Sequence, residues 1–191
     1  MRKVMVYTSV TMDGVMQSPG HPEEDTRGGF AYGGWATQYA DATTMEPASG
    51  EPGDLLLGRR TFEKMQAGWE HGPQDNPFTA IMNASRKYVA SRTLTEPLGW
   101  TNSVLLPGDA PGAVADLKAQ DGRDLVILGS GELTRALMPA RLIDAFVLLI
   151  HPLVLGTGIR LFQDAPPYAQ FDLTDSKASS TGVIIATYQL R

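Results

Sequence analysis

Short apolar segments recur along the chain, and most are bounded by Gly, Pro, Asn or Asp. Segments of this kind, rich in Val, Ile and Leu, are typical of β-strands. The run "LVIL" at 125–128 is wholly apolar, as expected of a central strand that is covered on both faces. We predict strands at residues 3–11, 54–58, 79–83, 103–106, 124–128, 144–151, 170–176 and 182–190.

Helical patterns lie between several of these segments, in "TFEKMQAGW", "GAVADLKAQ" and "ELTRALMPA". The alternation of strands and helices predicts an α/β fold with a mainly parallel sheet. The last two predicted strands are joined by "KASSTG", which favours an antiparallel hairpin at the sheet edge.

Residues 17–53 do not fit this alternation. They are rich in Gly, Pro and acidic residues and are much longer than an ordinary connection. Loops of this length are often lids or binding loops, and only "WATQYADA" suggests a short helix within it. We see no linker or internal repeat, and we therefore expect a single domain over residues 1–191.

Composition narrows the possible partners. The formal net charge is −5, which argues against binding to nucleic acid, because a protein surface that binds nucleic acid needs to be basic. The absence of cysteine excludes a disulfide, a thiol nucleophile and a thiolate metal site. No apolar run approaches the roughly 18 residues of a membrane span, and "MRKVMVYTSV" reads as a first strand rather than a signal peptide. We expect a cytoplasmic protein that binds neither nucleic acid nor membrane.

The segment "DLLLGRRTFEKM" places Arg59, Arg60 and Lys64 at the start of a predicted helix, with Thr61 as a plausible N-cap. Each cation there costs on the order of 0.3–1 kcal/mol against the helix dipole. A bound phosphate would reverse this sign, because free backbone N–H groups and arginine forks both suit it. The alternative is that the arginines point to solvent and pair with Glu63 or another acid.

Two other turns have similar chemistry. "LVILGSGELTRAL" joins a strand to a helix through Gly129, Ser130 and Gly131, and "IMNASRKYVAS" places Ser85 and Arg86 after another apolar run. Packing alone could explain the glycines, and the second turn could simply be solvated. If all three turns follow parallel strands, however, they gather at the strands' carboxyl ends, where α/β proteins bind ligands. Three such turns would suit the separate phosphates of a dinucleotide.

Candidate substrate residues follow the first predicted strand. Asp13 and Gly14 form a common turn dipeptide, but Asp13 could also anchor a substrate or donate a proton. Phe30, Tyr32 and Trp35 lie among glycines and could stack on a flat heterocycle or pin the loop to the core.

Other catalytic classes find little support. His21, His71 and His151 have no close ligand spacing, so we expect no metal site, and His151 before proline is interpreted as structural. "GSGEL" does not satisfy G-x-S-x-G, which argues against a serine hydrolase.

Six segments together resemble the dihydrofolate reductase-like superfamily, and most closely the branch related to the reductase (C-terminal) domain of bifunctional riboflavin-biosynthesis deaminase-reductases. They are "TMDGVMQSPG", "EEDTRGGFAYGGW", "DLLLGRRTFEKM", "NASRK", "LVILGSGELTRAL" and "HPLVLGTGIRLF", in order over nearly the whole chain. The resemblance implies a three-layer α/β sandwich with a mostly parallel central sheet, flanking helices and a C-terminal antiparallel hairpin. It also implies NADPH as cofactor and a homodimer.

The resemblance also assigns residues to the cofactor and the substrate. Cofactor residues are Gly58, Arg59, Arg60 and Thr61 at the adenosine-side phosphates; Ser85 and Arg86, with Asn83 in the same segment, at the 2′-phosphate; and Gly129, Ser130, Gly131, Glu132 and Leu133 under the pyrophosphate and nicotinamide ribose. Substrate residues are Asp13, which is also the candidate catalytic residue, Gly14 and Trp35.

The chain departs from the family pattern in three ways. The zinc deaminase signature is impossible without cysteine. The lysine that commonly follows the first Asp-Gly is replaced by Val15, and no carboxylate aligns with the pterin-binding acid of dihydrofolate reductases. We expect a reductase that moves hydride from NADPH to a C=N or C=O carbon of a small heterocycle, related to 5-amino-6-(5-phosphoribosylamino)uracil reductase and dihydrofolate reductase. The alternative is a non-catalytic nucleotide-binding or sensing dimer.

Overall fold

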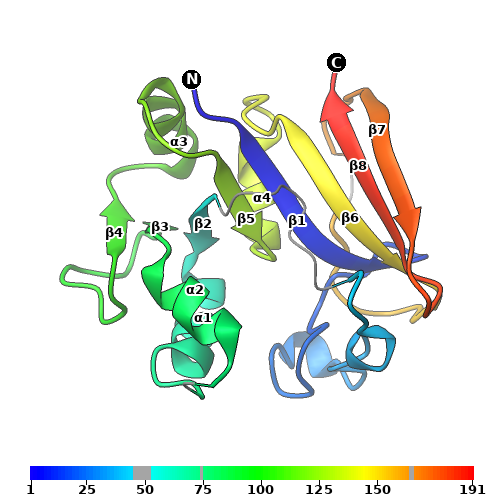
Figure 1. Cartoon of the computed structure of the whole chain (residues 1–191). Helices are drawn as coiled ribbons and strands as arrows, with labels where there is room; N and C mark the ends of the chain where they lie inside the picture. Colours follow the sequence, from blue (N-terminus) through cyan, green and yellow to red (C-terminus); the bar gives the residue numbers. More distant parts are fainter. Residues whose placement is uncertain (45–52, 74, 164–165) are drawn as a thin grey trace. The chain divides into compact units, whose positions relative to one another are not determined.

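The computed structural model describes residues 1–44, 53–73, 75–163 and 166–191 (Figure 1). The chain forms two compact units. Unit 1 comprises Met1–Met5 and Glu51–Ile143, and unit 2 comprises Val6–Gly50 and Asp144–Arg191. Strand β1, Val4–Thr11, begins in unit 1 and continues in unit 2.

Unit 1 contains a parallel sheet in the order β4-β3-β2-β5. The start of the chain follows β5 in this sheet, because the Leu125 N–H donates to the Lys3 carbonyl over 2.7 Å. Phe62 and Trp100 pack with the apolar side chains of the central strands in one buried cluster. The strand bounds are Asp54–Gly58 (β2), Lys87–Ala90 (β3), Ser103–Leu106 (β4) and Leu125–Leu128 (β5).

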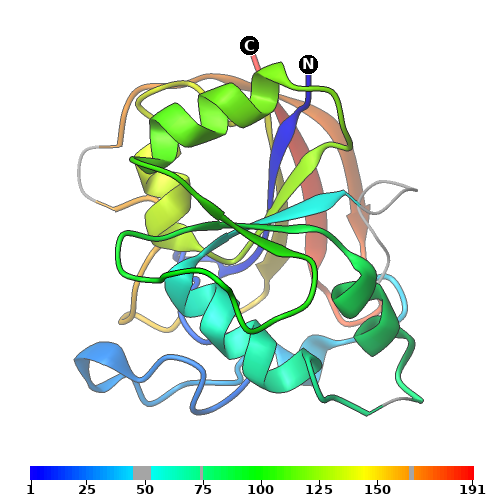
Figure 2. The same ribbon diagram turned by 90° about the vertical axis from the view of Figure 1, so that its left-hand side faces the viewer.

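Helices cover both faces of this sheet (Figure 2). In the sheet order β4-β3-β2-β5, the chain passes from β2 to β3 toward the β4 edge. From β4 it passes in the opposite direction to β5. Right-handed crossovers therefore place α1 and α2 on one face and α3 on the other. In agreement, α1 packs with α2, and α3 packs with α4. The bounds are Arg59–Trp69 (α1), Pro77–Ala84 (α2), Ala110–Ala119 (α3) and Gly131–Leu137 (α4).

Unit 2 contains hydrogen-bonded strands in the order β1-β6-β8-β7. Strand β8 pairs antiparallel with both neighbours, so the predicted C-terminal hairpin is confirmed. Short 3-10 turns at Arg27–Gly29 and Thr37–Tyr39 interrupt the long loop that follows β1. The strand bounds are Ala145–His151 (β6), Phe171–Ala178 (β7) and Ile184–Leu190 (β8).

The predicted α/β sandwich is confirmed, with one strand misplaced. Residues 79–83 belong to helix α2, because the Asn76 side chain accepts the Phe78 N–H as an N-cap and Pro77 occupies the first helical turn. The strand of this region is β3, which the sequence analysis did not predict. Among the described residues, no helix is both long and apolar enough to cross a bilayer.

Candidate functional site

The carboxyl ends of three parallel strands of unit 1 lie at one edge of its sheet. Strand β2 ends at Gly58, β5 ends at Leu128, and β3 ends at Ala90. Gly58 is paired with Ala90 in the β2–β3 register. The residues that directly follow these strands are thus at the edge where α/β proteins hold ligands. We call this the carboxyl edge and the opposite end of the same strands the amino edge.

Helix α1 begins at the carboxyl edge without a side-chain cap. Its N-cap is Gly58, in extended conformation, so the prediction that Thr61 is the N-cap is wrong. Within the described part of the chain, no hydrogen bond satisfies the N–H groups of Arg59, Arg60 and Thr61. The half-buried Arg59 makes no ion pair with the described residues. Three amides without a partner among the described residues therefore lie at a positive helix end that begins with Arg59, where an anion binds favourably.

Helix α4 begins beside α1. Gly129 has a φ of 56°, a left-handed conformation suited to glycine, and a Cβ there would lie 3.9 Å from Thr61. The next residue, Ser130, is buried, and its Oγ accepts the Gly58 N–H over 3.1 Å. This bond joins the starts of the two helices. The side chain of Leu133 is buried near Gly58, and the contact of Leu133 with a cofactor stays a prediction.

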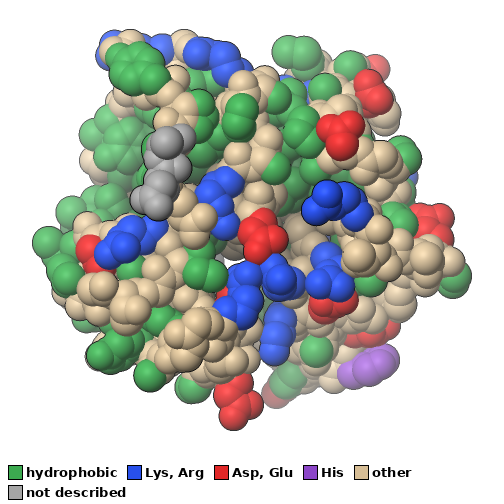
Figure 3. Space-filling view, turned by 180° about the vertical axis from the view of Figure 1, so that it is seen from behind, with side chains coloured by type: hydrophobic (Ala, Val, Ile, Leu, Met, Phe, Trp, Pro, Cys, Tyr) green, Lys and Arg blue, Asp and Glu red, His purple; other side chains and the backbone are tan. Residues whose placement is uncertain are grey.

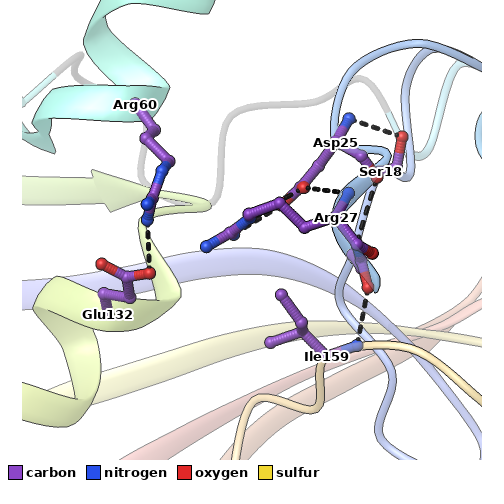
Figure 4. A network of polar contacts seen from close by, with 7 residues as sticks. Ser18, Asp25, Arg27, Arg60, Glu132 and Ile159 are labelled. Atoms are coloured by element: carbon purple, nitrogen blue, oxygen red, sulfur yellow. Dashed lines mark hydrogen bonds and ion pairs between the residues drawn. The ribbon is translucent and has the colours of Figure 1, made fainter. Parts of the chain in front are cut away.

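Arg60 and Glu132 form an ion pair across the two helix starts (Figure 4). The Arg60 Nη1 lies 2.5 Å from Glu132 Oε1, and both side chains are more than half exposed, at 51% and 63%. The solvent-exposed, acid-paired reading of the cationic turn is therefore correct for Arg60, with Glu132 rather than Glu63 as the acid. It does not apply to Arg59.

Ser85 and Arg86 do not lie at the carboxyl edge. Lys87, the first residue of β3, is paired with Leu55 near the start of β2, so Ser85 and Arg86 precede the strand at the amino edge. Ala90 lies four positions after Arg86, about 13 Å along an extended strand. The expectation that all three turns share one edge is wrong, because 79–83 is a helix and the turn precedes a strand instead of following one.

The side chains of this turn are engaged in local structure. Ser85 Oγ donates to the Ile81 carbonyl over 2.8 Å at the end of α2. The Arg86 guanidinium lies over the Tyr88 ring, 5.3 Å from its centroid. The Asn83 side chain donates to the Trp69 carbonyl over 3.1 Å and accepts the Trp100 indole N–H over 2.6 Å. Asn83 is therefore a structural residue.

A second Ser–Arg pair, Ser91–Arg92, follows β3 at the carboxyl edge. The Ser91 Oγ accepts the N–H groups of Thr93 and Leu94, at 3.1 and 3.0 Å, and so shapes a tight turn. Arg92 is exposed and makes no ion pair with the described residues. Ser91 Oγ lies 3.5 Å from Thr93 Oγ1, so the turn carries two hydroxyls beside a free guanidinium. The sequence analysis missed this pair because it did not predict β3, although "KYVASRT" contains the signal.

The amino edge instead carries buried charged side chains that have polar partners, although the buried Ser103 Oγ beside Lys87 has none among the described residues. The Lys87 ammonium donates to the carbonyls of Ser85 and Thr101 over 2.7 and 2.9 Å and lies 4.3 Å from the Trp100 ring centroid. Burial lowers the pKa of Lys87 to about 8. Arg2 forms a buried ion pair with Asp54 at 2.6 Å.

In unit 2, Asp13 holds a loop. Its carboxylate accepts the Thr11 hydroxyl at 2.6 Å and the Leu155 and Gly156 N–H groups at 3.2 and 2.9 Å, and Arg160 lies 3.4 Å away. Burial would raise the pKa of Asp13, but the hydrogen bonds from Thr11, Gly156 and Leu155 outweigh it and lower the pKa to about 2. Asp13 is therefore ionised at neutral pH, which favours the anchoring role over the proton-donor role considered from the sequence.

Gly14 and Val15 complete this turn. Gly14 has a φ of 80°, and its carbonyl accepts the Leu161 N–H at 3.0 Å. The Val15 side chain is fully buried with Phe30 and Trp35. A lysine at position 15 would have to bury its charge in this cluster, which explains physically why the family's lysine has no counterpart here.

Trp35 belongs to the core of unit 2 rather than to an open stacking surface. It is buried, its indole N–H donates to the Gln17 carbonyl over 2.7 Å, and its ring meets His151 edge-to-face at 5.0 Å. The core interpretation is correct for Phe30 and Trp35, whereas Tyr32 is 52% exposed. The buried His151 is structural as predicted, and burial lowers its pKa.

The loop after Gln17 is held by polar contacts within unit 2 (Figure 4). Arg27 pairs with Asp25 at 2.6 Å, and the Asp25 N–H donates to Ser18 Oγ over 3.1 Å. The Ile159 N–H donates to Gln17 Oε1 over 2.9 Å. Among the described residues, no group of His, Asp or Glu could hold a metal ion.

Comparison with known proteins agrees with this architecture. The uncharacterized protein YyaP of Bacillus subtilis (strain 168) is 28% identical over 139 residues, which cover 70% of this chain and 72% of that protein. A putative riboflavin biosynthesis protein from Shewanella sp. PV-4 superposes with a TM-score of 0.73 at 22% identity and 99% coverage of both chains. Dihydrofolate reductase from Enterococcus faecalis, complexed with NADP(H), superposes with a TM-score of 0.56 at 15% identity, covering 99% of this chain and 96% of that one. These superpositions establish the dihydrofolate reductase-like fold.

The family is identified over almost the full length of the chain. The family model of the RibD C-terminal domain matches residues 2–185, which include both edges of the unit 1 sheet and all of β1 and β6. The protein therefore belongs to the RibD C-terminal domain family, a reductase-type family with the dihydrofolate reductase-like fold.

Proposed function

We propose that this protein is an NADPH-dependent reductase that transfers hydride to a C=N or C=O carbon of a small heterocycle. The observation that carries the proposal is the carboxyl edge of unit 1. The free amides and Arg59 directly follow Gly58, and Ser91–Arg92 directly follow Ala90, its partner in the sheet. The start of α4 is joined to the start of α1 by the hydrogen bond between Ser130 and Gly58. These groups suit the pyrophosphate and 2′-phosphate of NADPH, because each offers charge-assisted or backbone donors to phosphate oxygens.

In this proposal Arg92, with the hydroxyls of Ser91 and Thr93, replaces Ser85–Arg86 as the 2′-phosphate contact. The N–H groups of Arg59–Thr61 and the Arg59 guanidinium hold the adenosine-side phosphates. NADPH supplies the hydride when bound, and the protein binds and orients it. Because the Asp13 carboxylate is ionised, water rather than Asp13 delivers the accompanying proton, and Asp13 fixes the loop at residues 155–160.

The buried Val15 argues for a substrate without the phosphoribosyl group of the riboflavin-pathway pyrimidine, because no cation is available at that position. A homodimer and a cytoplasmic location remain expectations from the sequence. Light scattering on the purified chain tests the first.

Titration of the protein with NADPH and NADH, followed by quenching of tryptophan fluorescence, tests cofactor binding. We expect saturable NADPH binding in the micromolar range and NADH binding at least about tenfold weaker, since a charge-assisted bond to phosphate contributes roughly 1.5–3 kcal/mol. Lack of saturable NADPH binding would contradict the proposal.

A screen of NADPH oxidation over pteridines, flavin precursors and quinones separates this proposal from its alternative. Turnover of any compound identifies a reductase and its substrate class. NADPH binding without oxidation of any compound favours the non-catalytic sensing protein.

A further inference from the structure

The ion pair between Arg60 and Glu132 lies where the proposed cofactor phosphates bind. Arg60 is the second residue of α1, and Glu132 is the second residue of α4. The two helix starts are joined by the Gly58–Ser130 hydrogen bond, so the Glu132 carboxylate stands at the cationic start of α1. Its negative charge on the Arg60 guanidinium is of the same sign as the phosphate that this helix start suits.

We infer that Glu132 is a specificity-determining residue that competes with a phosphate of the dinucleotide for Arg60. The inference depends on the proposed function, because it concerns the same carboxyl edge. A phosphate approaching Arg60 must replace the Glu132 carboxylate on the guanidinium and must also overcome its negative charge. Glu132 therefore lowers the affinity of the edge for every ligand that places a phosphate at Arg60, so that only ligands with further contacts bind tightly.

The exposure of the pair makes this exchange feasible. Both side chains are more than half exposed, and exposed ion pairs are weak and screened by salt. By contrast, the buried Arg2–Asp54 pair of the same unit is not accessible to a ligand. Basic and acidic side chains are also interspersed on the face of the molecule in Figure 3, so acids beside cations are a general feature of this surface. Glu132 is distinct because it bridges two helix starts.

Replacement of Glu132 by Gln removes the charge and keeps the size of the side chain. In Glu132→Gln we expect the affinity for NADPH and for 2′,5′-ADP to rise about three- to tenfold. This is the size of effect expected when a phosphate no longer has to break an exposed ion pair and is no longer repelled by the negative charge of Glu132. Affinity for adenosine, which has no phosphate, should stay within about twofold. Glu63→Gln, which removes the same charge from an exposed position on α1, should change none of the three affinities by more than about twofold.

The Arg60→Ala background tests the competition itself. If Glu132 acts by holding Arg60, the gain from Glu132→Gln should fall to half or less when Arg60 is absent. An equal gain in both backgrounds, or unchanged or weaker NADPH binding in Glu132→Gln, would overturn the inference while leaving NADPH binding by the parent protein intact. Failure of the parent protein to bind NADPH would instead refute the proposed function.

Discussion

The two ends of strand β3 carry the same dipeptide in opposite settings. Ser85–Arg86 precedes the strand at the amino edge of the unit 1 sheet, and Ser91–Arg92 follows it at the carboxyl edge. At the amino edge, Ser85 closes α2 and Arg86 packs over Tyr88. At the carboxyl edge, Ser91 shapes a turn and Arg92 is exposed beside the uncapped start of α1. The comparison shows that side-chain chemistry alone does not identify a phosphate site; the direction of the neighbouring strand decides it.

The two edges also use their polar groups differently. At the amino edge, donors and acceptors satisfy one another in the interior, as in the Lys87 and Arg2–Asp54 contacts. At the carboxyl edge, backbone donors of α1 have no partner among the described residues. We therefore infer that the contacts of the amino edge stabilise the folded protein and that the carboxyl edge binds the ligand.

The largest effect is expected from Lys87→Met, at the amino edge. This change removes the buried ammonium that donates to the carbonyls of Ser85 and Thr101, and we expect a loss of about 2–4 kcal/mol in the free energy of unfolding. Urea denaturation measures it. The exposed Lys3→Met is the matched control and should change stability by less than about 0.5 kcal/mol. A loss below about 1 kcal/mol for Lys87→Met would show that the amino edge is not held in this way.

A comparison of Arg92→Ala with Arg86→Ala tests the assignment of the two Ser–Arg pairs. Removal of Arg92 should weaken NADPH binding by about 10- to 100-fold and NADH binding by less than about threefold, because only NADPH carries the 2′-phosphate. Arg86→Ala should leave both affinities within about twofold. The reverse pattern, with Arg86 selective for NADPH, would restore the assignment of the 2′-phosphate to Ser85–Arg86 that was made from the sequence.

Within the start of α1, Arg59 and Arg60 should differ. Arg59 makes no ion pair with the described residues, whereas Arg60 is paired with Glu132. Arg59→Ala should weaken NADPH binding about tenfold, and Arg60→Ala should weaken it less, because the parent protein must already break an ion pair to use Arg60. Fluorescence titration at fixed salt measures both, and unchanged affinity in both variants would make the turn purely structural.

A pH dependence is also expected at the amino edge. Burial lowers the pKa of Lys87 from 10.5 to about 8, so the folded protein binds fewer protons than the unfolded chain between these values. The cost of burying the ammonium is thus present below pH 8 and disappears as the pH approaches 10.5. The stability of the parent protein relative to Lys87→Met should rise between pH 7.5 and pH 10, as measured by urea denaturation at about those values. A constant difference would contradict the pKa assignment.

Periodicity and strand composition predicted most of the fold. Helix α2 was missed because "TAIMN" is as apolar as a buried strand, and only the Asn76-Pro77 start distinguishes it. For the site, the starts of α1 and α4 were predicted because glycine turns and cations are visible in sequence. The engagement of Asp13 with Leu155 and Gly156 could not be predicted, because those partners are 142 and 143 residues away along the chain.

A crystal structure of the protein with NADPH would show whether the carboxyl edge of unit 1 holds the cofactor. We expect the 2′-phosphate beside Ser91 and Arg92 and the other phosphates against the N–H groups of Arg59–Thr61, with Glu132 displaced from Arg60. NADPH bound at Ser85–Arg86, or bound with the carboxyl edge of unit 1 untouched, would contradict it.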